Sequence, residues 1–312
     1  MLELRFKDWI DVDEYVETDP KERGTLTFFL TGGLGNQFFQ VAMAELVRAH
    51  GRQVRLDSGG NRSPFGGIRA RELPTFPDIR HRPAHRCEGV PMARTMNKSF
   101  ERELFELVNS EELCCVRGYF QYVELLQADQ VRPTLLALVE SVLERSNFTP
   151  EVEAHNAVHV RMGDYTRQLT AEQYGCLDFN YYQSCLEMMP DQQVLVVTDD
   201  HRALKRLIPE MATASPNITV LRAAEATSFH VLATAQSLAI GNSTFSLWAA
   251  WYQTATLNRS GVYFPSPWFR NGRQMDLTQL GWSPVGSEFL DPATLRLPLR
   301  RLRTGRLRAL FW

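Results

Sequence analysis

The middle of the chain carries His159 and Arg161, two residues apart, so that on a strand both side chains point the same way. The guanidinium of Arg161 is a rigid fork of donors that matches a diphosphate and stays charged at any working pH. When a sugar leaves a nucleoside diphosphate, the phosphates gain negative charge, and a fixed cation stabilises that transition state more than the ground state. Arg161 is therefore a candidate catalytic residue in a sugar-nucleotide site, with the His159 imidazole as a hydrogen-bonding neighbour. A structural pair at a strand end is the alternative.

A glycine-rich turn at residues 32–37 is the second segment that could do chemistry. It follows an apolar run and opens a helical pattern, where the free backbone N–H groups of a helix can hold a phosphate. Gly33 and Gly35 allow the backbone to pass close to a ligand, and Asn36 can hydrogen-bond a sugar or a phosphate. The turn also imitates a dinucleotide-binding loop, because Asp57 ends the next predicted strand about 20 residues later. A tight turn that needs glycine only for its geometry is the alternative.

A third segment, residues 242–246, also follows an apolar run and opens a helical pattern. The hydroxyl groups of Ser243 and Thr244, with the N–H groups of the helix start, could bind the same diphosphate from the opposite side. An ordinary N-cap is the alternative, because serine and threonine are favoured there in any helix.

Three acidic residues lie close to the predicted ends of strands. Asp164 is a candidate base or ribose contact, or else it caps the turn or orients Arg161. Asp199 and Asp200 end another apolar run, where ligands of open α/β sheets gather, and they could contact a ribose or cap the next helix. With His50, these acids are the candidates for the general base, and sequence spacing does not choose among them. Two adjacent carboxylates without a third ligand predict no metal site.

The elements that must position these residues alternate between strands and helices. The predicted strands are 25–30, 53–57, 113–116, 157–160, 193–197, 218–221 and 237–240. The predicted helices are 38–51, 179–189, 201–207, 228–235 and one that begins at residue 245, with a further helical pattern over 121–147 that Pro133 interrupts. Continuous apolar strands between helices predict an α/β fold whose parallel sheets are buried on both faces.

Length and composition fit a two-domain globular protein. The chain has 312 residues, 44% of them hydrophobic, and a net charge of −2, which gives no general reason to expect a nucleic-acid partner. We predict an N-terminal extension at 1–24, two α/β domains at 25–150 and 151–290 and a basic tail at 291–312.

The sequence predicts a cytoplasmic location. No run approaches the roughly 18 apolar residues of a membrane-spanning helix, and the opening residues do not resemble a signal peptide. Five cysteines without a C-x-x-C pair are typical of reduced thiols. The tail at 295–312 mixes arginine with leucine and could touch an anionic membrane surface, peripherally at the inner face, or pack on the protein's own acidic surface.

Together, the segments resemble a known family. Gly-Gly-Leu-Gly-Asn-Gln-Phe-Phe-Gln from residue 32, His-Val-Arg-Met-Gly-Asp-Tyr from 159 and Asn-Ser-Thr-Phe-Ser-Leu-Trp-Ala-Ala-Trp from 242 occur in the order found in the bacterial-type α-1,2-fucosyltransferases. The Pro-Ser-Pro-Trp element near 265 is similar to the closing element of that family. The resemblance covers roughly residues 25 to 283, and the combination is more specific than any one segment.

The resemblance implies a metal-independent, inverting transferase with two Rossmann-like domains facing across a cleft, the GT-B type. The acceptor-side Rossmann-like domain would be 25–150, and the GDP-sugar-binding domain would be 151–290. The donor would be GDP-L-fucose, with no further cofactor, and the acceptor would be the 2-hydroxyl of a galactose-containing glycan. Asn36 and Arg161 would touch the β-phosphate or the fucose, and His159 would approach the nucleoside. Gly33 and Gly35 would belong to the donor loop. The residues expected to line the diphosphate side are Ser243, Thr244 and Phe245.

Two positions depart from the family pattern and keep other functions open. Met162 stands where a second arginine is usual, and Ser228 stands where an acid is usual, with Glu225 as the nearest acidic substitute. One alternative is a nucleotide-sugar or dinucleotide binding protein without transferase activity. The other is a transferase that uses a different GDP-sugar on the same scaffold. The acceptor would be selected by the irregular region at 58–125.

Overall fold

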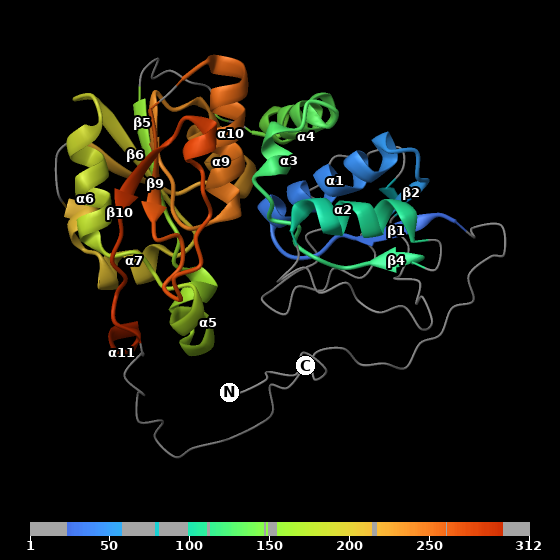
Figure 1. The fold of residues 1–312 in the computed structure, drawn as a ribbon. Helices are drawn as coiled ribbons and strands as arrows, with labels where there is room; N and C mark the ends of the chain where they lie inside the picture. Colours follow the sequence, from blue (N-terminus) through green and yellow to red (C-terminus); the bar gives the residue numbers. More distant parts are fainter. Residues whose placement is uncertain are drawn as a thin grey trace, which may run out of the picture. The chain divides into compact units, whose positions relative to one another are not determined.

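A computed structural model describes the chain as two compact units (Figure 1). The described residues are 24–57, 79–80, 99–110, 113–146, 148, 155–213, 217–259 and 261–295. Unit 1 contains those up to position 148 together with Ala224–Ala233 and Thr244–Asn258, and unit 2 contains the others. The predicted N-terminal extension and the basic tail lie outside the described residues, except for Gly24 and 291–295.

Unit 1 is a parallel sheet with helices. In the described part of the chain its strands are β1 (Leu26–Phe29), β2 (Val54–Asp57), β3 (Ile79–Arg80) and β4 (Cys115–Val116), in the order β3-β2-β1-β4. Its helices are α1 (Leu34–Ala49), α2 (Phe100–Asn109), α3 (Glu124–Gln127), α4 (Arg132–Glu144), most of α9 (Glu225–Thr234) and α10 (Thr244–Leu257). Pro133 lies in the first turn of α4, where its missing N–H is harmless.

Aromatic side chains of three helices form the centre of the unit 1 core. Phe38 and Phe39 of α1 pack edge-on against Trp248 of α10, with ring centroids 5.5 and 5.0 Å apart. Phe38 also meets Phe229 of α9 at 6.0 Å, and all four rings are buried. The sequence predicts one continuous domain over 151–290, and here the structure differs. The helices α9 and α10 return to unit 1 because their apolar residues complete its core.

Unit 2 is a six-stranded parallel sheet in the described part of the chain. Its strands are β5 (His155–Val160), β6 (Gln193–Thr198), β7 (Ile218–Leu221), β8 (Ser237–Ala239), β9 (Gly261–Ser266) and β10 (Ser283–Gly286). Their order is β10-β9-β8-β5-β6-β7, which is the 3-2-1-4-5-6 order of a Rossmann fold when the strands are renumbered in chain order. Its helices are α5 (Gln168–Gln173), α6 (Phe179–Met188), α7 (His201–Leu207), α8 (Glu210–Thr213) and α11 (Pro292–Leu295).

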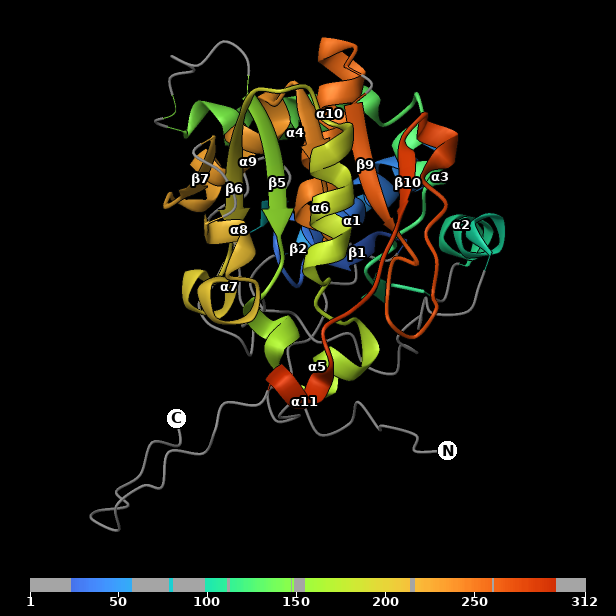
Figure 2. The same ribbon diagram turned by 90° about the vertical axis from the view of Figure 1, so that its left-hand side faces the viewer.

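The central strands of unit 2 are buried on both faces, as their apolar runs predict. All six residues of β5 are buried, and α6 lies across one face of the sheet (Figure 2). Tyr181 of α6 is buried there, and its hydroxyl donates to the Ile240 carbonyl at 2.6 Å. The predicted fold class, α/β with two Rossmann-like domains, is confirmed. The cleft expected between the domains stays a prediction. No helix in the described part of the chain has the length and apolar character needed to span a membrane.

Candidate functional site

Arg161 stands at the topological switch point of the unit 2 sheet. The strands β5 and β8 are neighbours, but the chain leaves β5 toward β6 and leaves β8 toward β9. Ligands of open α/β sheets bind at the carboxyl ends of the strands at this point. Arg161 follows β5 directly, and Asn242 and Ser243 follow β8. The structure therefore brings Arg161 and the start of the predicted segment at 242–246 to one edge of the sheet.

Two carboxylates hold the Arg161 guanidinium. Its Nη1 lies 2.5 Å from Asp199 Oδ2, and its Nη2 donates a hydrogen bond to Asp164. The other oxygen of Asp199 accepts the backbone N–H groups of Met162 and Gly163 at 2.8 and 3.1 Å. A Cβ atom on Gly163 would stand 2.3 Å from Asp199 Oδ2, so a larger residue would displace this carboxylate. Asp199 therefore fixes both the guanidinium and the loop that carries it.

The electrostatics of this edge favour a charged Arg161 and a neutral His159. Burial alone would lower the pKa of Arg161, but the nearby carboxylates of Asp199 and Asp164 raise that pKa above its ordinary value. Burial, and then the positive charge of Arg161, lower the pKa of His159 to about 3. The Arg161 side chain keeps 27% of its surface exposed, so a ligand can reach it. Near neutral pH the site offers one lasting cation and one uncharged imidazole.

Tyr165 links the Arg161 loop to the segment that follows β8. Its hydroxyl donates to the Asn242 carbonyl at 3.1 Å, and its ring stacks on Tyr174 with centroids 5.3 Å apart. The Arg161 guanidinium lies over the same ring, 5.2 Å from its centroid. The Asn242 side chain in turn donates to the carbonyls of Tyr174 and Gly175 at 3.2 and 2.9 Å. These contacts hold the two loops of the switch point together.

In unit 1 the glycine-rich turn lies at the corresponding switch point, between β1 and β4. Two buried glutamines of α1 fix the turn. Gln37 Nε2 donates to the Gly32 carbonyl at 2.9 Å, and Gln40 bonds both backbone groups of Thr31. Gln40 Nε2 also donates to the Gly118 carbonyl at 3.0 Å, in the loop after β4. The turn is therefore rigid, and it is tied to the other loop of the same switch point.

Asn36 accepts hydrogen bonds from two sides. Its Oδ1 accepts from Gln121 Nε2 at 2.9 Å and from the Thr244 hydroxyl at 3.1 Å. The starts of α1 and α10 approach closely at this point: a Cβ atom on Gly35 would stand 2.4 to 2.6 Å from backbone atoms of Thr244 and Phe245. Glycine at position 35 therefore allows the starts of α1 and α10 to pack closely together.

The other predicted donor residues are divided between the two units. Gly33 is the N-cap residue of α1, and its carbonyl starts the helical hydrogen bonds. Ser243 is buried, and its N–H bonds the Gly241 carbonyl at 2.7 Å. The Phe245 ring packs edge-on against Phe229 at 5.3 Å. Gly33, Gly35, Asn36, Thr244 and Phe245 thus belong to unit 1, and His159, Arg161 and Ser243 belong to unit 2.

Two of the candidate bases, Asp200 and His50, lie at helix ends. Asp200 is the N-cap of α7 and accepts hydrogen bonds from the N–H groups of Arg202 and Ala203 at 3.0 and 2.9 Å. This is the helix-capping alternative given above. His50 is the C-cap residue of α1, so the 16-residue helix separates it from the glycine-rich turn by about 24 Å. Asp164 and Asp199 stay beside Arg161.

Sequence reasoning missed Tyr165 and Gln121. Tyr165 is part of the quoted His-Val-Arg-Met-Gly-Asp-Tyr segment, and the signal was its place directly after Asp164 in the same short turn. Gln121 lies in an aromatic-rich turn after a two-residue strand, β4, and no chemistry-bearing spacing marks it. Only the strand order brings its loop beside β1.

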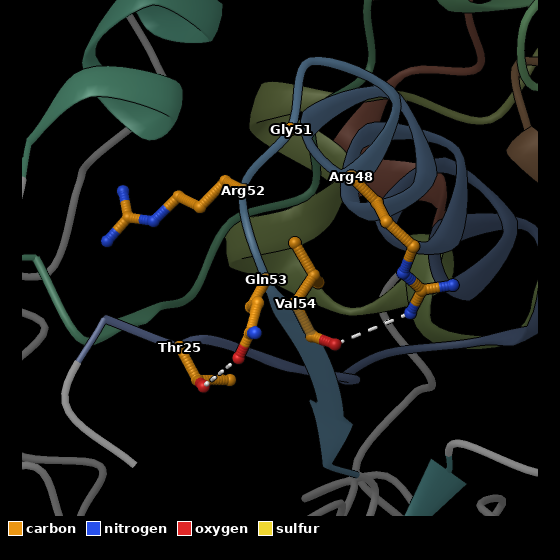
Figure 3. Close-up of a pocket in the computed structure, with 6 residues that line it drawn as sticks. All are labelled: Thr25, Arg48, Gly51, Arg52, Gln53 and Val54. Atoms are coloured by element: carbon orange, nitrogen blue, oxygen red, sulfur yellow. Dashed lines mark hydrogen bonds between the residues drawn. The ribbon is translucent and has the colours of Figure 1, made fainter. Parts of the chain in front are cut away.

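A shallow pocket in unit 1 lies away from these residues (Figure 3). It is lined by Thr25, Arg48, Gly51, Arg52, Gln53 and Val54. These residues end α1, precede β1 or β2, or begin β2. The pocket therefore lies at the amino ends of the strands, opposite to the edge where ligands of such sheets bind. Among the described residues, no group of three or more His, Cys, Asp or Glu side chains could hold a metal ion.

Comparison with known proteins adds a family. The sequence model of glycosyl transferase family 11 matches residues 95–263, more than half of the chain. The O-antigen biosynthesis glycosyltransferase WbnK of Escherichia coli is 26% identical over 305 residues, which covers 81% of this chain and 98% of WbnK. An α-1,2-colitosyltransferase of Escherichia coli is 24% identical over 269 residues, which covers 77% of this chain and 91% of that protein.

Solved structures with distant similarity include POFUT1 and Arabidopsis thaliana FUT1. POFUT1 in complex with GDP is 13% identical, with a TM-score of 0.41, over 79% of this chain and 99% of that chain. A mutant of Arabidopsis thaliana FUT1 in complex with GDP is 12% identical, with a TM-score of 0.40, over 77% of this chain and 70% of that chain.

Proposed function

The chain belongs to glycosyl transferase family 11, and we propose that it transfers L-fucose from GDP-fucose to the 2-hydroxyl of a β-galactoside, with inversion and without a metal ion. One observation carries the proposal. A guanidinium that stays charged at any working pH, Arg161, is held by two carboxylates at the switch point of a Rossmann-type sheet. The match to the relative named for O-antigen biosynthesis supports a bacterial surface glycan as the acceptor.

In the proposed reaction, the acceptor hydroxyl oxygen bonds to C1 of fucose as the bond from C1 to the β-phosphate oxygen breaks. The electron pair of that bond stays on the phosphate, and Arg161 and the Asn36 amide stabilise the charge. The neutral His159 contacts the nucleoside as a hydrogen-bonding group. Asp164 receives the acceptor proton, because its carboxylate touches the guanidinium and caps no backbone N–H among the described residues. Asp199, with both oxygens engaged, positions the loop.

The test is transfer of radiolabelled fucose from GDP-fucose to lactose and to a panel of β-galactosides, with the linkage read by NMR. We expect an α-1,2 linkage and equal turnover in the presence of EDTA. The proposal would be overturned if the protein showed no donor hydrolysis and no transfer to any member of a broad acceptor panel. A thermal-shift comparison separates the binding-protein alternative, because stabilisation by NAD but not by GDP would favour a dinucleotide site.

Transfer of another GDP-sugar is the second candidate, and the similarity to a protein named as an α-1,2-colitosyltransferase favours it. Met162 and Ser228 depart from the fucosyltransferase pattern on the donor side. Competition between GDP-fucose, GDP-colitose and GDP-mannose at equal concentrations measures the ratio of their kcat/KM values. A ratio that favours GDP-colitose over GDP-fucose would replace fucose by colitose in the proposal.

A further inference from the structure

We propose that Gln121 and Thr244 are positioning residues that orient the Asn36 amide toward the sugar-nucleotide donor. This inference rests on the proposed function, because it concerns the residue that contacts the departing phosphate. It adds Gln121 to the site and gives the Thr244 hydroxyl a role through Asn36.

The orientation of the Asn36 amide follows from hydrogen-bond chemistry. An asparagine side chain has one acceptor oxygen and one amino group with two donors. Gln121 Nε2 and the Thr244 hydroxyl both donate to Asn36 Oδ1, at 2.9 and 3.1 Å, so the two lone pairs of that oxygen are used. The amino group is thereby directed the other way, and among the described residues it donates no hydrogen bond. An oriented amide that presents only donors suits a phosphate oxygen.

The amino group is directed into the glycine-rich turn. A Cβ atom on Gly32 would stand 2.8 Å from Asn36 Nδ2, and the φ of +79° at Gly32 favours glycine. The turn is the loop that follows β1 at the carboxyl edge of the sheet. Asn36 therefore points its donors at the edge where a ligand of this sheet binds.

The loop that supplies Gln121 is built to hold it there. Phe120 has a φ of +48°, a conformation that costs a bulky residue free energy. Its ring is buried and packs on Phe28 of β1, with centroids 5.5 Å apart. Gln40 of α1 bonds the Gly118 carbonyl in the same loop. The strained backbone of Phe120, its ring contact with Phe28 and the hydrogen bond from Gln40 to Gly118 together fix the backbone position from which the Gln121 side chain extends.

The experiment is a set of mutant cycles on the full chain. The variants are Gln121→Met, Thr244→Val, Thr244→Ser and Asn36→Ala, alone and in combination. All residues exchanged are uncharged, so no variant changes the net charge of the protein. Gln193→Met, at the exposed start of β6, and Thr256→Val, exposed on α10, serve as matched controls.

We expect Gln121→Met and Thr244→Val each to lower kcat/KM for the donor by roughly twofold to tenfold. Their combination should approach the loss of Asn36→Ala, about tenfold to a hundredfold, because both orienting donors are then gone. Thr244→Ser should keep turnover near that of the wild type. The KM of the acceptor and the melting temperatures should stay close to those of the control variants.

The decisive measurement is made in the Asn36→Ala background. There, neither Gln121→Met nor Thr244→Val should lower kcat/KM for the donor any further. Effects that persist there would overturn the inference, because the two residues would then act independently of Asn36. The same cycle is measured on the dissociation constant of GDP, which applies even to variants with slow turnover. A wild type that binds GDP but transfers no fucose would refute the proposed function and leave this cycle decisive. If the wild-type protein neither binds GDP nor transfers fucose, the proposed function and this inference are both overturned.

Discussion

Replacing Gly35 by alanine would press a Cβ atom of α1 into the backbone at the start of α10. The nearest atoms would be the carbonyl carbon and oxygen of Thr244 and the nitrogen of Phe245, at 2.4, 2.5 and 2.6 Å. Ordinary contact begins at 3.4 Å, so the two helix starts must separate by about 1 Å. All three of these atoms belong to the backbone, so no flexible side chain can move aside.

The magnitude follows from two opposing effects. Overpacking of this kind costs about 1–3 kcal/mol, whereas alanine gains at most about 1 kcal/mol over glycine in helix propensity. The cost of overpacking therefore exceeds the gain in helix propensity. The unfolding free energy should fall by about 1–2 kcal/mol, which lowers the melting temperature by about 2–8 °C. The same shift lengthens the 3.1 Å bond from Thr244 to Asn36 to about 4 Å, beyond a hydrogen bond.

The assay is thermal unfolding combined with donor kcat/KM, with Gly286→Ala as the matched control. Gly286 lies in β10, has nothing within 4 Å of an added Cβ and has no positive φ, so its replacement should leave both quantities unchanged. For Gly35→Ala we expect the lower melting temperature and a roughly twofold to tenfold loss of kcat/KM. If Gly35→Ala melts and turns over like the control, the close approach of the two helices is refuted.

Three further changes test other parts of the structure. Arg161→Lys should lower transfer about a hundredfold or more while circular dichroism shows an intact fold, because lysine cannot form the bidentate contact; retained turnover would remove Arg161 from the mechanism. The pKa of His159 is 6.5 in the unfolded chain and about 3 in the native state, so between these pH values only the unfolded chain binds the extra proton. The unfolding free energy should therefore fall by up to about 5 kcal/mol as the pH is lowered from 6.5 to 3. Urea titrations measure this slope, and a His159→Gln variant that keeps the same slope would contradict the assignment. Trp251→Phe should destabilise unit 1 by about 1–3 kcal/mol, because the buried Leu126 carbonyl loses its 2.8 Å hydrogen bond; an unchanged urea midpoint would show that this bond is dispensable.

Predicting the fold from the sequence succeeded where apolar runs are long enough to identify a period. The strand β6 and the helix α10 lie where their patterns predict, because the sheet and the core require continuous apolar surface there. The strand β9 was not predicted, since it contains Pro265, and proline usually indicates the end of a strand. The pairing of β9 with β8 covers only Gly261–Tyr263, so the missing N–H of Pro265 costs that ladder nothing.

The candidate site shows what sequence alone cannot decide. Asp199 and Asp200 are neighbours with the same chemistry, and the sequence predicts similar roles for both. In the structure the backbone directs Asp199 to Arg161 and directs Asp200 to the first turn of α7. Side-chain direction at the end of a strand depends on dihedral angles that no spacing rule supplies.

Strand order explains why one part of the site was missed. In each unit the strand order reverses between two neighbouring parallel strands, β1 and β4 in unit 1 and β5 and β8 in unit 2. Four loops therefore flank a switch point, and three of them carry the segments whose residue types could do chemistry. The fourth loop, after β4, carries Gln121. Its sequence is unremarkable because its side chain acts through a hydrogen bond to Asn36, so only a structure that places β4 beside β1 could connect the two.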